Sequence, residues 1–315
     1  MDTIVSLSPQ MLRQRQGHQS TASSSSSAWA ITTARIGRHL STASSCSSPR
    51  LLIKQRATAA SAPAQKEKEV VFVAGATGRV GSRAVRELMK LGFRVRAAVR
   101  NAQRATSLVQ KEKEQQLLEL VECDLEKEPQ EGIVSAIGNA SLVVCSIGAS
   151  EKEILDVTGP YRIDYMATSK LVQAATAAKQ VEHFILVTSL GTNKIGFPAF
   201  LLNLFWGVLF WKRRAEEALI ASGIPYTIIR PGGMERPTDA YKETHNLVLA
   251  PEDTYVGGQV SNLQVAELIG CMATNRSAAY CKTVEAVAEI TAPLLPMEQL
   301  LSAIPSKREQ RPADR

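Results

Sequence analysis

From residue 70 onward, short apolar runs alternate with segments that have helical periodicity. The apolar run 70–74 ends at a glycine, and apolar residues then recur at helical spacing from Val80 to Met89. Further apolar runs, each short enough for a strand, lie at 93–100, 118–123, 141–147, 183–188 and 225–229. Strands that alternate with helices are typical of an α/β fold with a doubly wound parallel sheet. We therefore predict such a sheet.

Two later segments depart from this alternation. Residues 232–305 contain predicted helices at 264–272 and 297–304, and we interpret them as a small C-terminal cap against the sheet, followed by a polar tail at 306–315. The segment Phe197–Trp211 is strongly apolar but shorter than the roughly 20 residues of a membrane-spanning helix. It is interpreted as a helix packed over the ligand crevice of the sheet, and a membrane-surface or partner-docking patch is the alternative.

The first 65 residues have a composition of their own. They contain seven Lys or Arg residues, a single acid (Asp2) and a serine run at 23–27. A basic, serine-rich and acid-poor segment is typical of an organelle transit peptide, whereas a secretory signal has an apolar core. The serine run favours a chloroplast over a mitochondrion, which is the second choice, and an ordinary disordered tail is the alternative interpretation.

Charge and cysteine spacing bear on which partners are expected. Of the formal net charge of +7, residues 1–65 contribute +6, so the basic balance does not indicate nucleic-acid binding by the rest of the chain. The five cysteines form no Cys-x-x-Cys pair and have no histidines at metal-ligand spacing, so no metal site is predicted. Cys123 and Cys145 lie in apolar runs and are expected to be buried, reduced thiols.

The turn between the first apolar run and the first helix has glycines at 75, 78 and 81. A dinucleotide loop needs glycine for a sharp turn, for close approach of the pyrophosphate and for tight packing of helix on strand. The amide N–H groups and positive dipole end of the helix would hold the pyrophosphate. The candidate cofactor-binding residues here are Gly75, Ala76, Thr77, Gly78, Arg79, Val80 and Gly81.

The last residue of the second predicted strand bears on the choice of cofactor. NAD-binding sites usually place an acid there to hold the ribose 2′-hydroxyl, whereas NADP-binding sites place an arginine. This chain has Arg100 at that position, and a guanidinium can hold a 2′-phosphate with two hydrogen bonds. We therefore expect NADP(H) in preference to NAD(H).

Together these features resemble the atypical branch of the short-chain dehydrogenase/reductase superfamily, over residues 68–290. The resemblance implies one NAD(P)-binding Rossmann domain at 66–305 and a set of further cofactor contacts. Those contacts are an adenine-binding pair, the turn after the fourth strand, the serine after the fifth strand and the turn beside the nicotinamide. In this chain the adenine-binding pair is Asp124 and Leu125, and the turn after the fourth strand contains Ser146, Ile147 and Gly148. The serine after the fifth strand is Ser189, and the turn beside the nicotinamide contains Pro231.

Longer strings make the resemblance narrower. Thr158–Tyr165, Ser189–Lys194 and Pro231–Asn246 resemble the dehydrogenase-like subunits of the chloroplast inner-envelope Tic translocon, which serves protein import. That resemblance implies an NADP(H)-binding redox sensor that moves between the stroma and the envelope or thylakoid membrane, with membrane or translocon proteins as partners. Such subunits also bind ferredoxin–NADP reductase through Ser/Pro-rich C-terminal repeats. Residues 305–315 contain no such repeat, which argues against that partner.

The candidate catalytic residues are Ser189 and Lys212. In this superfamily a lysine binds the cofactor ribose and lowers the pKa of a tyrosine four residues earlier, which transfers the proton. Lys212 stands where that lysine would be, but Val208 stands in place of the tyrosine. Tyr241, Lys242 or His245 in the cap could supply a proton instead.

Three hypotheses follow for the function. The first is an NADP(H)-binding, redox-sensing module of a chloroplast membrane-associated protein. The second is an NADPH-dependent reductase of the atypical family with a non-standard proton donor. The third is a scaffold that binds nucleotide only incidentally. Val208 favours the first hypothesis over the second.

Overall fold

The computed structural model describes residues 69–108, 116–149, 156–193 and 207–308. The predicted transit peptide, most of the apolar segment 197–211 and residues 309–315 of the tail lie outside the described residues. All described residues belong to one compact unit, 63–315.

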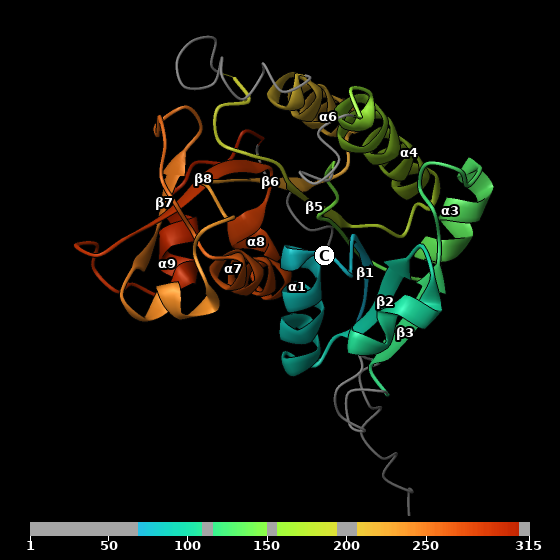
Figure 1. Ribbon diagram of the computed structural model, residues 1–315, viewed down its shortest axis with the longest axis horizontal. Helices are drawn as coiled ribbons and strands as arrows, with labels where there is room; N and C mark the ends of the chain where they lie inside the picture. Colours follow the sequence, from blue (N-terminus) through green and yellow to red (C-terminus); the bar gives the residue numbers. More distant parts are fainter. Residues whose placement is uncertain (1–68, 109–115, 150–155, 194–206, 309–315) are drawn as a thin grey trace, which may run out of the picture. The chain divides into compact units, whose positions relative to one another are not determined.

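Within the described residues, eight strands form one sheet in the order β3-β2-β1-β4-β5-β6-β8-β7 (Figure 1). All neighbouring strands are parallel except the antiparallel pair of β7 and β8. The strands are β1 (Val70–Ala74), β2 (Arg94–Val99), β3 (Leu118–Glu122), β4 (Leu142–Cys145), β5 (His183–Val187), β6 (Tyr226–Pro231), β7 (Asn246–Pro251) and β8 (Lys282–Glu289). The predicted doubly wound parallel sheet is confirmed.

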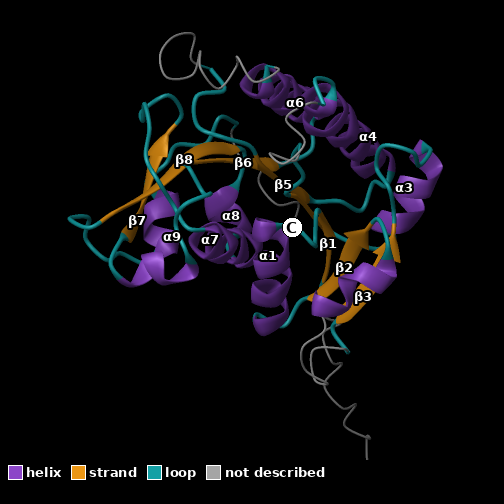
Figure 2. Ribbon diagram, in the orientation of Figure 1, coloured by secondary structure: helices purple, strands orange, loops and turns teal. Residues whose placement is uncertain are grey.

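Helices cover both faces of the sheet (Figure 2). The α-helices are α1 (Arg79–Lys90), α3 (Gln130–Ile137), α4 (Thr168–Ala177), α6 (Val208–Ser222), α7 (Asn262–Thr274), α8 (Arg276–Ala279) and α9 (Met297–Ser302). The 3₁₀ segments are η1 (Ala102–Leu108) and η3 (Asp239–Glu243), and the π-helix is η2 (Pro160–Ala167). Helices α1 and α7 pack on one face, and α3, α4 and α6 pack on the other.

The central strands are buried along their whole length, because helices lie over both faces. Successive residues of a strand point to opposite faces. Val71 and Val73 of β1 accordingly join the core beneath α1 and α7, whereas Phe72 joins the core beneath α3 and α4. This burial explains why β1, β4 and β5 could be recognised as apolar runs.

The C-terminal region contains two strands of the sheet in addition to the helices that were predicted for the cap. Helices α7 and α9 coincide with the two predicted ones, but β8 and β7 extend the sheet beyond β6. The charged residues Lys282 and Glu285 of β8 hide this strand from an apolar pattern. Both are buried: the Lys282 ammonium donates to the carbonyl of Leu301, and the Glu285 carboxylate accepts from the backbone N–H groups of Asp253 and Tyr255.

Candidate functional site

The glycine loop is packed too tightly for side chains at two of its positions. Gly75 has a positive φ of 78°, and a Cβ there would lie 2.7 Å from the carbonyl oxygen of Ser146. A Cβ on Gly81 would collide with the carbonyl of Gly75 and lie 2.9 Å from Ser146 Oγ. Gly75 therefore makes the turn, and Gly81 lets α1 press against the end of β1.

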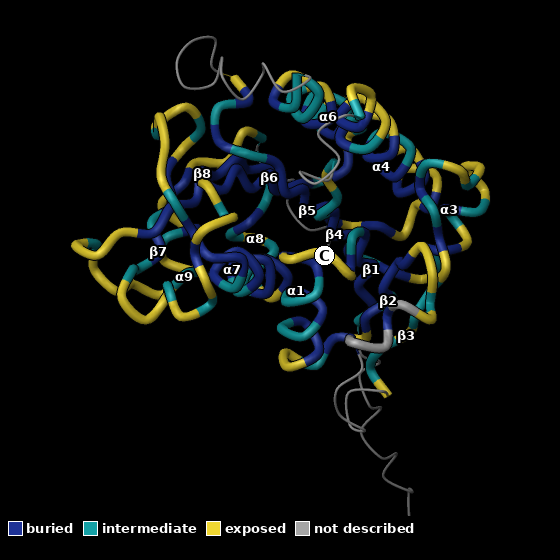
Figure 3. The backbone as a smooth tube through the Cα atoms, viewed as in Figure 1, coloured by how far each residue is buried: buried dark blue, intermediate teal, exposed yellow. Residues whose placement is uncertain are grey.

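The start of α1 faces outward from this loop. Thr77, Gly78 and Arg79 are exposed, whereas β1 before them is buried (Figure 3). Gly78 precedes the helix and supplies no side-chain cap. Because the first turn of an α-helix has N–H groups without intrahelical acceptors, this end of α1 suits an anionic group.

The carboxyl ends of the parallel strands bring the other candidate residues to the same edge of the sheet. β1 lies between β2 and β4, and this is the switch point at which a doubly wound sheet binds its ligand. Arg100 follows β2 and is exposed. Asp124 follows β3, where its carboxylate accepts from the N–H of Glu126 at 3.2 Å, and Leu125 beside it is buried.

The turn after β4 is bonded to the last residue of β1, directly before the glycine loop. Ser146 Oγ donates to the carbonyl of Ala74 at 3.1 Å, and Ile147 packs on the core beneath α3 and α4. A Cβ on Gly148 would lie 3.6 Å from Lys212 Nζ. The lysine of α6 therefore reaches the turn that borders the glycine loop.

Lys212 is held by an acid that the sequence analysis did not single out. Its Nζ donates to Asp164 Oδ1 at 2.6 Å, and Asp164 Oδ2 accepts from the N–H of Ala149 at 3.2 Å. The side chain of Asp164 is 1% exposed and that of Lys212 is 15% exposed. The only signal in the sequence is an acid within the apolar periodicity of the helix at 161–178.

The positions around β5 and the start of α6 lack the proton donor of the superfamily. Val208 is the first residue of α6 and follows the left-handed Gly207, which has a φ of 70°. Ser189 lies just after β5 and is half-buried. Its neighbour Thr188 donates from Oγ1 to Glu216 Oε1 at 2.7 Å, so α6 is bonded to the end of β5.

Glu216 also forms a buried ion pair with Arg230 of β6. The guanidinium donates to the carboxylate at 3.0 Å from Nε and at 2.7 Å from Nη2, and both side chains are almost fully buried. Burial alone would lower the pKa of Arg230, but the hydrogen bonds and charge of Glu216 outweigh it and the pKa is raised. The pair fixes α6, and with it Lys212, against the sheet.

The alternative proton donors in the cap have partners of their own. Tyr241 stacks on His245, with ring centroids 3.7 Å apart. Lys242 pairs with Glu267 of α7. Arg83 Nε of α1 donates to Asp239 Oδ1 at 2.7 Å, so η3 is bonded to the helix that carries the glycine loop.

Aromatic residues gather where the apolar segment 197–211 enters the described chain. The Trp211 ring stacks on Tyr165 at 5.7 Å and meets Tyr161 edge-on at 4.8 Å. Leu209 is buried, but Phe210 is 52% exposed. Both interpretations of the segment stay predictions. Among the described residues, no helix has the length and apolar character to span a membrane.

The buried thiols fit a structural role. Cys123 and Cys145 are both buried, and burial raises the pKa of each to about 11. Both are therefore protonated near neutral pH. No group of three or more His, Cys, Asp or Glu residues with metal-binding geometry is present in the described part of the chain.

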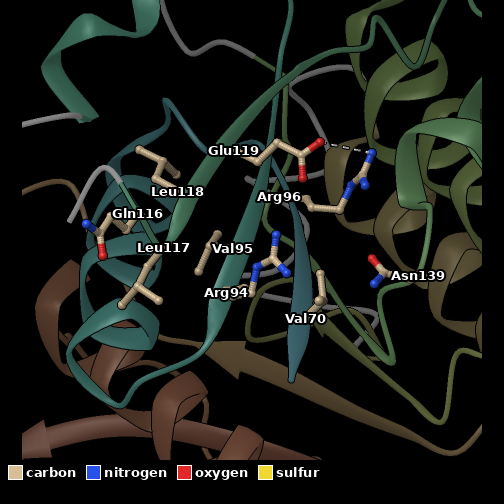
Figure 4. A pocket seen from close by; sticks show the side chains of 9 residues that line it. All are labelled: Val70, Arg94, Val95, Arg96, Gln116, Leu117, Leu118, Glu119 and Asn139. Carbon is tan, nitrogen blue, oxygen red and sulfur yellow. Dashed lines mark ion pairs between the residues drawn. The ribbon is translucent and has the colours of Figure 1, made fainter. Parts of the chain in front are cut away.

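A pocket lies at the other edge of the sheet, at the amino-terminal ends of β1, β2 and β3 (Figure 4). Its lining residues are Val70, Arg94, Val95, Arg96, Gln116, Leu117, Leu118, Glu119 and Asn139. Because the glycine loop follows the carboxyl end of β1, this pocket is separate from the candidate nucleotide site.

Comparison with known proteins decides the family. The family model described as NAD(P)H-binding matches residues 75–276. The chain belongs to this NAD(P)H-binding family. A solved oxidoreductase from Lactococcus lactis shares the fold, with a TM-score of 0.59 and 20% identity, over 74% of this chain and 95% of that one.

Two plant relatives are much more similar. The chain is 68% identical to "Protein TIC 62, chloroplastic" of Oryza sativa over 300 residues, which is 88% of this chain and 60% of the relative. It is 67% identical to the protein of that name from Pisum sativum over 260 residues, which is 79% of this chain and 48% of the relative. The predicted resemblance is confirmed, and these chloroplast relatives support the chloroplast location. The chain spans about half the length of these two relatives.

Proposed function

We propose that this chain is the NADP(H)-binding, redox-sensing module of a chloroplast membrane-associated protein. The observation that carries the proposal is the glycine loop, in which Gly75 and Gly81 leave no room for a Cβ and the uncapped start of α1 faces outward. Such a helix end binds a pyrophosphate through its N–H groups and dipole. The family match supports the same site, because it begins at Gly75.

The proposed cofactor is NADP(H) rather than NAD(H). Arg100 is exposed directly after β2, the strand next to the glycine loop on the side where the adenosine ribose of a doubly wound fold is bound. Arg79 in the loop is also exposed. In this proposal Arg100 holds the 2′-phosphate, Asp124 and Leu125 border the adenine, and Ser189, Lys212 and Pro231 face the nicotinamide half.

Two observations favour sensing over catalysis. Val208 has no proton to give, and Lys212 is engaged by Asp164. A reductase remains the second candidate because Lys212 lies beside Gly148, at the turn next to the glycine loop. A turnover screen with NADPH and quinones or carbonyls separates the two candidates: turnover that Lys212→Met abolishes would support the reductase.

The proposed partners are plastid membrane or translocon proteins, because two similar relatives carry the TIC 62 name. The test is sedimentation of the full chain with inner-envelope vesicles in excess NADPH or excess NADP⁺. We expect the bound fraction to differ between the two cofactors. Gly81→Ala should remove that difference, because its Cβ would collide with the carbonyl of Gly75 and distort the glycine loop. Gly132→Ala, in α3, is the control, because its Cβ would come close only to the flexible end of Glu128 and would otherwise make ordinary contact with Pro129. Equal sedimentation under both conditions contradicts the sensor.

Residues 1–65 are proposed to be the plastid transit peptide, on composition alone. A reporter fused behind these residues is expected to enter chloroplasts. Import into mitochondria instead would contradict this assignment.

A further inference from the structure

The ion pair of the buried Asp164 and the partly buried Lys212 lies beside the turn after β4. It links η2 to α6, and the Asp164 carboxylate also accepts from Ala149 in the turn after β4. A Cβ on Gly148 would lie 3.4 Å from Asp164 Oδ1 and 3.6 Å from Lys212 Nζ. Both charges therefore border the backbone of this turn, in which Ser146 bonds to the end of β1 and packs against Gly75 and Gly81 of the glycine loop.

The topology indicates which half of the cofactor these charges would meet. A dinucleotide bound at the switch point places its pyrophosphate at the first loop and its two halves over opposite sides of the sheet. If Arg100 binds the adenosine half beside β2, the nicotinamide half lies over β4 and β5. Asp164 and Lys212 lie on that side. This step rests on the proposed function.

The two redox states of the cofactor differ in charge at the nicotinamide ring. The ring of NADP⁺ carries one positive charge, and the ring of NADPH is neutral. A fixed charge near the ring therefore changes the affinity for NADP⁺ relative to that for NADPH, because the phosphate charges are the same in both redox states. The effect is larger for buried groups, which solvent and salt screen less.

We propose that the Asp164–Lys212 pair sets the relative affinity of the site for oxidised and reduced cofactor. The Asp164 carboxylate offsets the Lys212 ammonium, so that the lysine binds the nucleotide without repelling an oxidised ring. Asp164 is a positioning and charge-balancing residue in this account, and it does not touch the cofactor.

The test is direct titration of the full chain with NADP⁺ and with NADPH, for the wild type and four variants. Asp164→Asn leaves the lysine charge unbalanced, and we expect the ratio of the NADP⁺ dissociation constant to that of NADPH to rise roughly three- to thirtyfold. Lys212→Met leaves the carboxylate unbalanced, and the ratio falls by a similar factor. The double variant removes both charges and returns the ratio towards the wild-type value. Lys90→Met, which removes a lysine paired with Glu87 at the far end of α1, leaves the ratio unchanged.

The ratio distinguishes this role from a merely structural one. If the variants weaken both cofactors equally, the pair only supports the fold and the inference is wrong. If the wild type binds neither cofactor, the proposed function is wrong, and this inference, which rests on it, is wrong as well. Should Asp164→Asn fail to fold, judged by circular dichroism, Lys212→Met and the double variant still give different predictions, because the ratio falls in the first and stays near the wild-type value in the second.

Discussion

Arg94 and Arg100 flank the same strand, β2, and both are exposed. Arg94 begins β2 and lines the pocket at the amino-terminal ends of the strands (Figure 4). Arg100 follows the carboxyl end of β2, at the opposite edge of the sheet. Of these two arginines, only Arg100 lies at the edge of the sheet that carries the glycine loop, and Arg94 is its matched control.

We predict that Arg100→Ala weakens NADPH binding roughly tenfold to a hundredfold, the range for loss of a charged hydrogen bond. NADH binding should change little, because NADH has no 2′-phosphate. Fluorescence titration with each cofactor measures both effects. Arg94→Ala is the control and should leave both affinities unchanged, and equal losses in the two arginine variants would exclude a specific phosphate contact.

Single site residues could be predicted from the sequence where their role depends on neighbouring residues in the chain. The glycines of the loop could be recognised because their roles depend on the adjoining strand and helix. Asp164 could not, because an acid in a helix is ordinarily solvated and its partner Lys212 lies 48 residues away. Only the packing of η2 on α6 brings the two together.

At the scale of elements, α6 is held to β6 by charge as well as by apolar contacts. The buried Arg230 guanidinium contacts Glu216 and also pairs with Asp253 at 3.3 Å, in the turn after β7. Such a pair is not evidence of large net stability, but removing one partner leaves a buried charge behind.

We predict that Arg230→Met lowers the free energy of unfolding by about 3 kcal/mol, because Glu216 stays buried without its main partner. The Glu216→Leu/Arg230→Met double variant should lose less than the single variant. Arg214→Met, which breaks an exposed pair with Glu217, should change stability by about 1 kcal/mol or less. Urea unfolding measures all three, and equal values for Arg230→Met and Arg214→Met would contradict the structural importance of the buried pair.

Buried charged residues also limit which strands can be predicted from the sequence. The six strands that the apolar runs predicted are present, because their burial leaves a continuous apolar pattern. Strand β8 escaped notice because Lys282 and Glu285 satisfy their polar groups with backbone partners while they are buried. A buried charge of this kind has the same appearance in the sequence as a solvated one.

At the scale of the whole molecule, the described residues form the fold of the NAD(P)H-binding family. The family match covers residues 75–276, which includes both the glycine loop and α7, the helix that packs on α1. The relatives named TIC 62 extend well beyond the aligned region. The central claim therefore concerns this fold alone: it binds NADP(H) at the glycine loop.

Calorimetric titration of the full chain with NADPH and, separately, with NADH tests that claim most directly. We expect saturable NADPH binding at micromolar concentrations, at least about tenfold tighter than NADH, consistent with one charged contact to the 2′-phosphate. Absence of saturable binding of either cofactor below about 1 mM, a free energy of roughly −4 kcal/mol, would contradict the account.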